Sequence, residues 1–140
     1  MVHRFVCILL AEDNEGDVFL VRRALDQYIG QYELLLARDG EEALKILERA
    51  EGDHDAPSPD FAVLDVNLPR CNGIQVLERL RNTARCAAAP VIIFTSSDSP
   101  EDKAAALRLG ANRYFEKPTD LDGFMKLGKL VKEILPEPAR

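Results

Sequence analysis

Short apolar runs alternate along this chain with longer stretches in which apolar residues recur every three or four positions. Val18, Val21 and Leu25 make such a stripe within residues 15–28, a spacing typical of a helix that buries one face. The apolar runs are only as long as strands, and the alternation repeats five times. The pattern predicts strands at residues 5–11, 32–37, 61–65, 91–95 and 111–116, followed in turn by helices at residues 15–28, 40–49, 73–82, 100–109 and 120–135.

Capping signals mark three of the predicted helix ends. Asp39, three residues before Glu42, predicts an N-cap with its capping-box partner for the second helix. Ser99 and Pro100 predict a cap and a first-turn proline for the fourth helix. Pro136 predicts the end of the last helix, because proline cannot continue the hydrogen-bond ladder.

Strands separated by helices of this length pair in parallel through right-handed crossovers. The first and fourth strands are almost entirely apolar, which suits positions covered by helices on both faces. We therefore predict an α/β fold, a doubly wound five-stranded parallel sheet with five helices, in a single domain of residues 1–140 whose core spans about 5–135. In such sheets, ligands bind beyond the carboxyl ends of the strands.

Composition narrows the class of protein further. The net charge of −6 argues against a nucleic-acid partner, and no apolar run is long enough for a membrane span. Three cysteines are an odd number without metal-site spacing, which favours the reducing cytoplasm. We also expect no signal peptide, because the N-terminus leads directly into a strand.

Polar residues stand at the carboxyl ends of four predicted strands. Glu12 and Asp13 follow the first strand, Asp65 ends the third, Thr95 ends the fourth, and Lys117 follows the fifth. Three clustered carboxylates repel one another unless a cation relieves them, and hard oxygen ligands suit Mg²⁺. A carboxylate is also a nucleophile toward phosphorus, while a hydroxyl and an ammonium can stabilise charged phosphoryl oxygens. The sequence thus predicts aspartyl phosphorylation in a magnesium-dependent acidic pocket.

Each of these residues also has a simpler explanation. The acidic pair Glu12-Asp13 could be only a helix cap, Asp65 a turn residue, Thr95 a packing residue and Lys117 part of a loop. Their joint placement at the ends of strands 1, 3, 4 and 5 favours the pocket.

The spacing of these residues forms a larger motif. Fifty-two residues separate Asp13 from Asp65, 30 more lead to Thr95 and 22 more to Lys117. The matching set also includes Asn67, Pro69, Gly73, Tyr114 and Pro118. With this motif the chain resembles a response-regulator receiver domain over essentially its whole length. The resemblance implies a flavodoxin-like sheet with strand order 2-1-3-4-5.

The resemblance also implies a role for each acidic residue. Asp65 would be the phosphoacceptor. Asp13, Asp65 and the backbone carbonyl of Asn67 would hold the Mg²⁺ ion, with Glu12 acting at least partly through water. The remaining matches concern the response to phosphorylation: Thr95 would be the switching hydroxyl, Lys117 would contact the phosphoryl group, and Tyr114 would be the rotating aromatic residue.

Finer similarities, at residues 8–18, 68–70, 95–97 and 117–121, resemble stand-alone regulators that are paired with phytochrome-type histidine kinases. The implied partner is therefore a sensor histidine kinase of that type. Because only residues 136–140 follow the last predicted helix, we expect no effector domain and an output through protein contact. The fourth helix, fifth strand and fifth helix would form the responding surface, which could carry a homodimer.

Two other functions fit part of the pattern. A hydrolase of the haloacid-dehalogenase type also uses an aspartyl nucleophile, but it needs a second Asp two residues further on, where this chain has Asn67. A degenerate receiver acting as a constitutive scaffold would not need the intact set of acidic, hydroxyl and amine residues. The sequence therefore favours a phosphorylation switch that transforms no separate substrate.

Overall fold

The computed structural model describes residues 5–135, and its centre is one parallel sheet. Its strands are β1 (Val6–Ala11), β2 (Tyr32–Ala37), β3 (Phe61–Leu64), β4 (Val91–Thr95) and β5 (Arg113–Glu116). Every neighbouring pair is parallel, and the order is β2-β1-β3-β4-β5. The predicted topology is confirmed.

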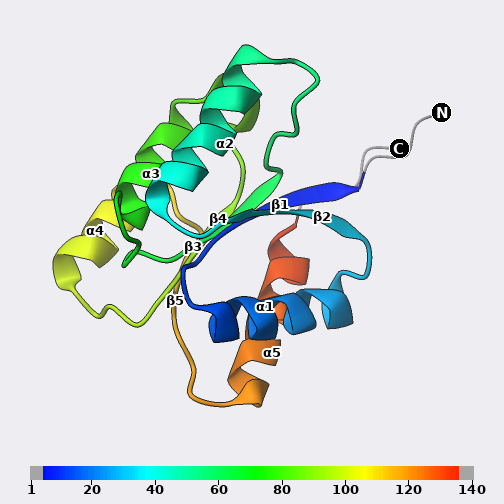
Figure 1. Cartoon of the computed structure of the whole chain (residues 1–140). Coiled ribbons are helices and arrows are strands. Elements are labelled where there is room, and N and C mark those ends of the chain that lie inside the picture. The colour runs from blue at the N-terminus through cyan, green and yellow to red at the C-terminus, as the bar shows by residue number, and fades with distance from the viewer. Residues whose placement is uncertain (1–4, 136–140) are drawn as a thin grey trace.

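Five helices cover the two faces of the sheet. They are α1 (Glu15–Tyr28), α2 (Gly40–Gly52), α3 (Gly73–Arg81), α4 (Pro100–Arg108) and α5 (Leu121–Ile134). Figure 1 shows α1 and α5 on one side of the sheet and α2, α3 and α4 on the other. Because each strand feeds a helix that returns over the sheet, all strand ends point to one edge.

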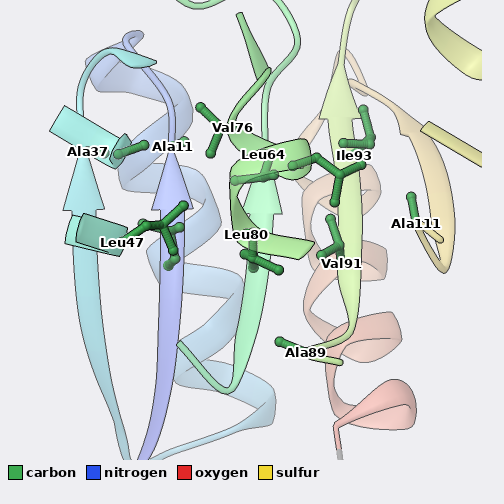
Figure 2. Packing of buried hydrophobic residues seen from close by; sticks show 14 of the residues in the cluster. Ala11, Ala37, Leu47, Leu64, Val76, Leu80, Ala89, Val91, Ile93 and Ala111 are labelled. Carbon is green, nitrogen blue, oxygen red and sulfur yellow. The ribbon is translucent and has the colours of Figure 1, made fainter. Parts of the chain in front are cut away.

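The core consists of two apolar layers, one on each side of the sheet. Strand residues contribute alternately, so Leu9 packs towards α2 and α3 whereas Ile8 packs towards α1 and α5. Figure 2 shows part of the first layer, where Leu47 and Leu80 approach strand residues such as Leu64. The central strands β1, β3 and β4 are almost fully buried, as their apolar sequences predict.

Most predicted boundaries hold to within one or two residues, with three corrections. Helix α2 runs to Gly52 rather than ending at Arg49, so the turn-rich connection is shorter than predicted. A short 3-10 helix at Ala84–Cys86 was not predicted. Asp39 caps α2 as expected, but the Glu42 carboxylate accepts from the Arg38 N–H (2.9 Å) instead of completing a capping box.

The predicted stop at Pro136 lies outside the described residues. No helix between residues 5 and 135 has the length and apolar character needed to cross a bilayer.

Candidate functional site

Three acidic residues meet where β1 and β3 end. Glu12 and Asp13 directly follow β1, and Asp65 directly follows β3, the strand beside it. One carboxylate oxygen from each lies within 4.8 Å of the other two. Glu12 is 1% exposed and Asp65 is 4% exposed, whereas Asp13 is open to solvent. The structure therefore brings together the three carboxylates that the sequence placed at this edge.

Lys117, just after β5, reaches into the same group of carboxylates. Its Nζ lies 2.8 Å from Asp65 Oδ2 and 2.9 Å from Glu12 Oε1. It also donates to Asp17 Oδ2 at 2.9 Å. Because all four side chains are largely or partly buried, these charges are less screened than surface ion pairs.

Backbone groups fix the orientation of the two buried carboxylates. The Asn67 N–H donates to Asp65 Oδ1 at 2.9 Å, so the two oxygens of Asp65 have different partners. The Asn14 N–H donates to Glu12 Oε2 at 3.1 Å. Asn67 thus contributes its N–H to the site, while a cation-binding role for its carbonyl stays a prediction.

Gly73 explains how α3 can begin directly behind Asp65. A Cβ atom at this position would lie 2.0 Å from the Asp65 carbonyl oxygen. Since nothing larger than hydrogen fits there, glycine lets the first turn of α3 press against the segment that carries the candidate nucleophile. The Gly73 N–H also donates to the Val66 carbonyl at 3.0 Å.

The pocket raises the pKa of both Glu12 and Lys117, for different reasons. Burial raises the pKa of Glu12 to about 7, although hydrogen bonds from Lys117 and the Asn14 backbone oppose the rise. Burial by itself would lower the pKa of Lys117, but hydrogen bonds to Asp65, Asp17 and Glu12 outweigh it and raise that pKa above its ordinary value. Lys117 is therefore charged at neutral pH.

The donor set fits a hard divalent cation. All three acidic residues offer carboxylate oxygens, the ligands that Mg²⁺ prefers, and the exposed Asp13 leaves a side open to water and to a substrate. Glu12 Oε1 is buried and faces the Lys117 ammonium at 2.9 Å. The described structure thus holds a positive charge where these carboxylates converge.

Thr95 and Tyr114 lie on the neighbouring strands of this edge. Thr95, at the end of β4, is fully buried, and its Oγ1 accepts from the Ser97 N–H at 3.2 Å. The Tyr114 hydroxyl donates to the Ser97 carbonyl at 3.0 Å. Both predicted switch residues therefore hydrogen-bond to the backbone of the same residue, Ser97.

Sequence reasoning did not identify Asp17 as part of the site. Asp17 lies in the first turn of α1, where an acidic residue ordinarily indicates only a favourable interaction with the helix dipole. Its N–H binds the N-cap Asn14, which places the residue beside the carboxyl end of β1. The usable signal was its position one turn beyond Glu12-Asp13 at the edge where ligands bind.

Comparison with known proteins agrees with this geometry. Residues 8–128 match the response regulator receiver domain family. Response regulator Rcp1 of Synechocystis sp. is 32% identical over 120 residues, which cover 86% of this chain and 82% of Rcp1. The Mn²⁺-bound structure of Rcp1 has a TM-score of 0.82 at 30% identity, covering 96% of this chain and 99% of that one. The phosphorylated cyanobacterial phytochrome response regulator RcpA also has a TM-score of 0.82, at 28% identity, covering 95% and 94% of the two chains.

The fold and the acidic edge define a signalling receiver of two-component phosphorelay systems. The chain belongs to the response regulator receiver domain family, and its relatives include the regulators Rcp1 and RcpA. A divalent metal fits the acidic pocket, and the Mn²⁺-bound relative supports this.

The raised pKa of Glu12 gives a testable pH dependence. The folded protein favours the neutral form of the Glu12 carboxyl. The contribution of this preference to the free energy of unfolding is therefore full below the ordinary pKa of 4.5 and is lost as the pH rises through about 7. We expect Glu12→Gln, which stays neutral, to be more stable than the parent by ~1–3 kcal/mol at pH 8 in EDTA, and by much less at pH 5. Urea unfolding followed by circular dichroism measures both differences.

The exposed Glu133→Gln on α5 is the control and should show no such pH-dependent gain. A Glu12→Gln variant that is equally stabilised at both pH values would contradict the buried-carboxyl explanation.

Proposed function

We propose that this protein is a phosphorylation switch that accepts a phosphoryl group on Asp65 from a sensor histidine kinase. The observation that carries the proposal is that the two carboxylate oxygens of Asp65 have different hydrogen-bond donors. Lys117 binds one carboxylate oxygen and the Asn67 N–H binds the other, within a cluster of carboxylates suited to a cation. Residues 5–135 would act as one receiver domain, in the cytoplasm, as the cysteine content suggests.

In the transfer step, an Asp65 oxygen forms a bond to phosphorus while the phosphorus–nitrogen bond of the kinase's phosphohistidine breaks. The imidazole departs with the bonding electron pair, and it is neutral because its other nitrogen carries a proton. Lys117 stabilises the negative charge of the phosphoryl oxygens, and the Thr95 hydroxyl hydrogen-bonds to one of them once it turns towards the site. The protein's chemistry is limited to forming and hydrolysing its own aspartyl phosphate.

Glu12, Asp13, Asp65 and the Asn67 carbonyl would hold Mg²⁺, with Glu12 acting partly through water. When bound, Mg²⁺ would offset the charge of the carboxylates and of the phosphoryl oxygens. The Asp13 carboxylate, being exposed, would orient the ion on the side from which a phosphodonor approaches.

The kinase partner we propose is of the phytochrome type, because RcpA is a phytochrome response regulator and Rcp1 shares the same fold and size. Candidate kinases from the same genome, phosphorylated with labelled ATP, would be mixed with the protein. Rapid transfer of label from one kinase and not from others identifies the partner, and no transfer from any of them would contradict this assignment.

A second interaction is a homodimer through the surface of α4, β5 and α5. Leu107 of α4 is 65% exposed, a large apolar side chain on that surface. The same surface carries Tyr114, whose ring lies 5.6 Å from Lys103 Nζ.

We expect labelling by acetyl phosphate to require a divalent cation. Excess EDTA should lower the rate at least ~10-fold, because the carboxylates and the incoming phosphoryl group would repel one another without the ion. Added Mg²⁺ should restore it. Circular dichroism in EDTA serves as the control for folding, and an undiminished rate in EDTA by a folded protein would count against the pocket.

A further inference from the structure

Lys117 has a carboxylate partner that does not belong to the cation site. Two of the three carboxylates around its Nζ, those of Glu12 and Asp65, are in the group of three that could hold a metal. The third partner, Asp17, lies outside that group. It comes from the first turn of α1, 100 residues earlier in the chain, and its Oδ2 is 2.9 Å from the ammonium.

A cation and this ammonium would compete for the carboxylates of Glu12 and Asp65. A divalent ion that takes up oxygens of Glu12 and Asp65 weakens their attraction for Lys117 and also repels it. The Lys117 side chain is only 14% exposed, so water cannot fully replace those contacts. An ammonium left without an anionic partner in such a place would raise the cost of binding the cation.

We propose that Asp17 is a positioning residue, which keeps the Lys117 ammonium paired and beside Asp65 when a divalent cation takes the oxygens of Glu12 and Asp65. The inference rests on the proposed phosphoacceptor function, because it assigns a role to a residue around the same pocket. It predicts that Asp17 affects cation affinity through Lys117, and not merely as one more negative charge near the site.

Mg²⁺ titrations of the unphosphorylated protein, followed by backbone amide chemical shifts, test this without any phosphodonor. Asp17→Asn should weaken Mg²⁺ binding about tenfold, the effect of losing one charge-assisted hydrogen bond. Lys117→Gln, which removes the competing ammonium, should bind Mg²⁺ more tightly than the parent. In the Lys117→Gln background, Asp17→Asn should change the affinity by no more than about twofold, because the two residues act as a pair.

Glu15→Gln is the matched control. Glu15 lies in the same turn of α1 and carries the same charge, but it pairs with Arg38 and is mostly exposed. Its removal should alter the affinity by no more than about twofold, which measures the long-range effect of one charge. The Lys117 side-chain ammonium gives a second signal: its ¹⁵N-edited resonance should persist with Mg²⁺ in the parent and broaden in Asp17→Asn.

The outcomes separate this inference from the function on which it rests. The positioning role alone is overturned if the parent binds Mg²⁺ but Asp17→Asn loses the same affinity with Lys117 present as in the Lys117→Gln background. It is also overturned if Asp17→Asn loses no more affinity than Glu15→Gln does. Parent protein that binds no Mg²⁺ overturns the proposed pocket and the inference together. Asp17→Ser also removes the carboxylate and should repeat the result, so the test stands even if one variant folds poorly.

Discussion

Asp65→Asn should lower labelling by acetyl phosphate at least ~10³-fold, because an amide oxygen is a poor nucleophile and the variant leaves no other acceptor in the same position. The substitution keeps the shape of the side chain. An oxygen remains that can accept from the Asn67 N–H (2.9 Å in the parent) or from Lys117. The loss should therefore be chemical and not structural, with a circular dichroism spectrum like that of the parent.

Asp98→Asn is the control, since Asp98 is an exposed carboxylate in the loop after β4, at the same edge of the sheet. It should label like the parent. Mass spectrometry of the labelled parent locates the phosphoryl group. Label that persists in Asp65→Asn, or that is found on another carboxylate, would assign the nucleophile elsewhere.

The strand order and the layers could be predicted because they depend on patterns that tertiary contacts reinforce. The apolar sequences of β1 and β4 require burial on both faces of the sheet. Each pair of successive strands is joined through a helix, and such a connection crosses over the sheet and leaves the strands parallel. The helix ends were less predictable. Helix α2 continues through Glu51 and Gly52, where composition favours a turn, and Arg85 binds the carbonyls of Ala50 and Asp53 at the end of that helix. Such a contact between residues 35 apart leaves no local signal.

The site was predictable as a set of residues but not as a network. Parallel strands bring their carboxyl ends together, so Glu12, Asp65 and Lys117 had to meet once the topology was known. The hydrogen bonds depend on side-chain geometry. Whether Lys117 binds two carboxylates or three depends on the orientation of the first turn of α1, which periodicity does not specify.

Asn67 has two consequences for the choice between functions. Its side chain cannot serve as the general acid or base that a haloacid-dehalogenase-type hydrolase needs at this position. Its N–H nevertheless orients the Asp65 carboxylate. The position would thus support formation of the proposed aspartyl phosphate without supplying a general acid or base for its hydrolysis.

Thr95→Ala should abolish the conformational response to phosphorylation while leaving labelling of Asp65 in place. Thr95 Oγ1 accepts from the Ser97 N–H, and Tyr114 donates to the Ser97 carbonyl. Ser97 Oγ in turn donates to Asp102 in α4 at 3.0 Å. A Thr95 hydroxyl that turns towards a phosphoryl oxygen gives up Ser97, and this loosens the anchors of both Tyr114 and α4. Phosphorylation shifts the population only through such differential contacts.

Hydrogen exchange of residues 99–130, with and without a beryllofluoride phosphoryl mimic, measures the response. The parent should change across α4, β5 and α5, and Thr95→Ala should give the same pattern in both states. Ser96→Ala removes an exposed hydroxyl from the adjacent residue and should keep the parent's response. An unchanged pattern in the parent would remove the switch altogether. A change that survives in Thr95→Ala would leave the switch but show that it does not depend on the contact between Thr95 and Ser97. Lys117, the other residue placed to contact the phosphoryl group, would then have to supply the differential contact.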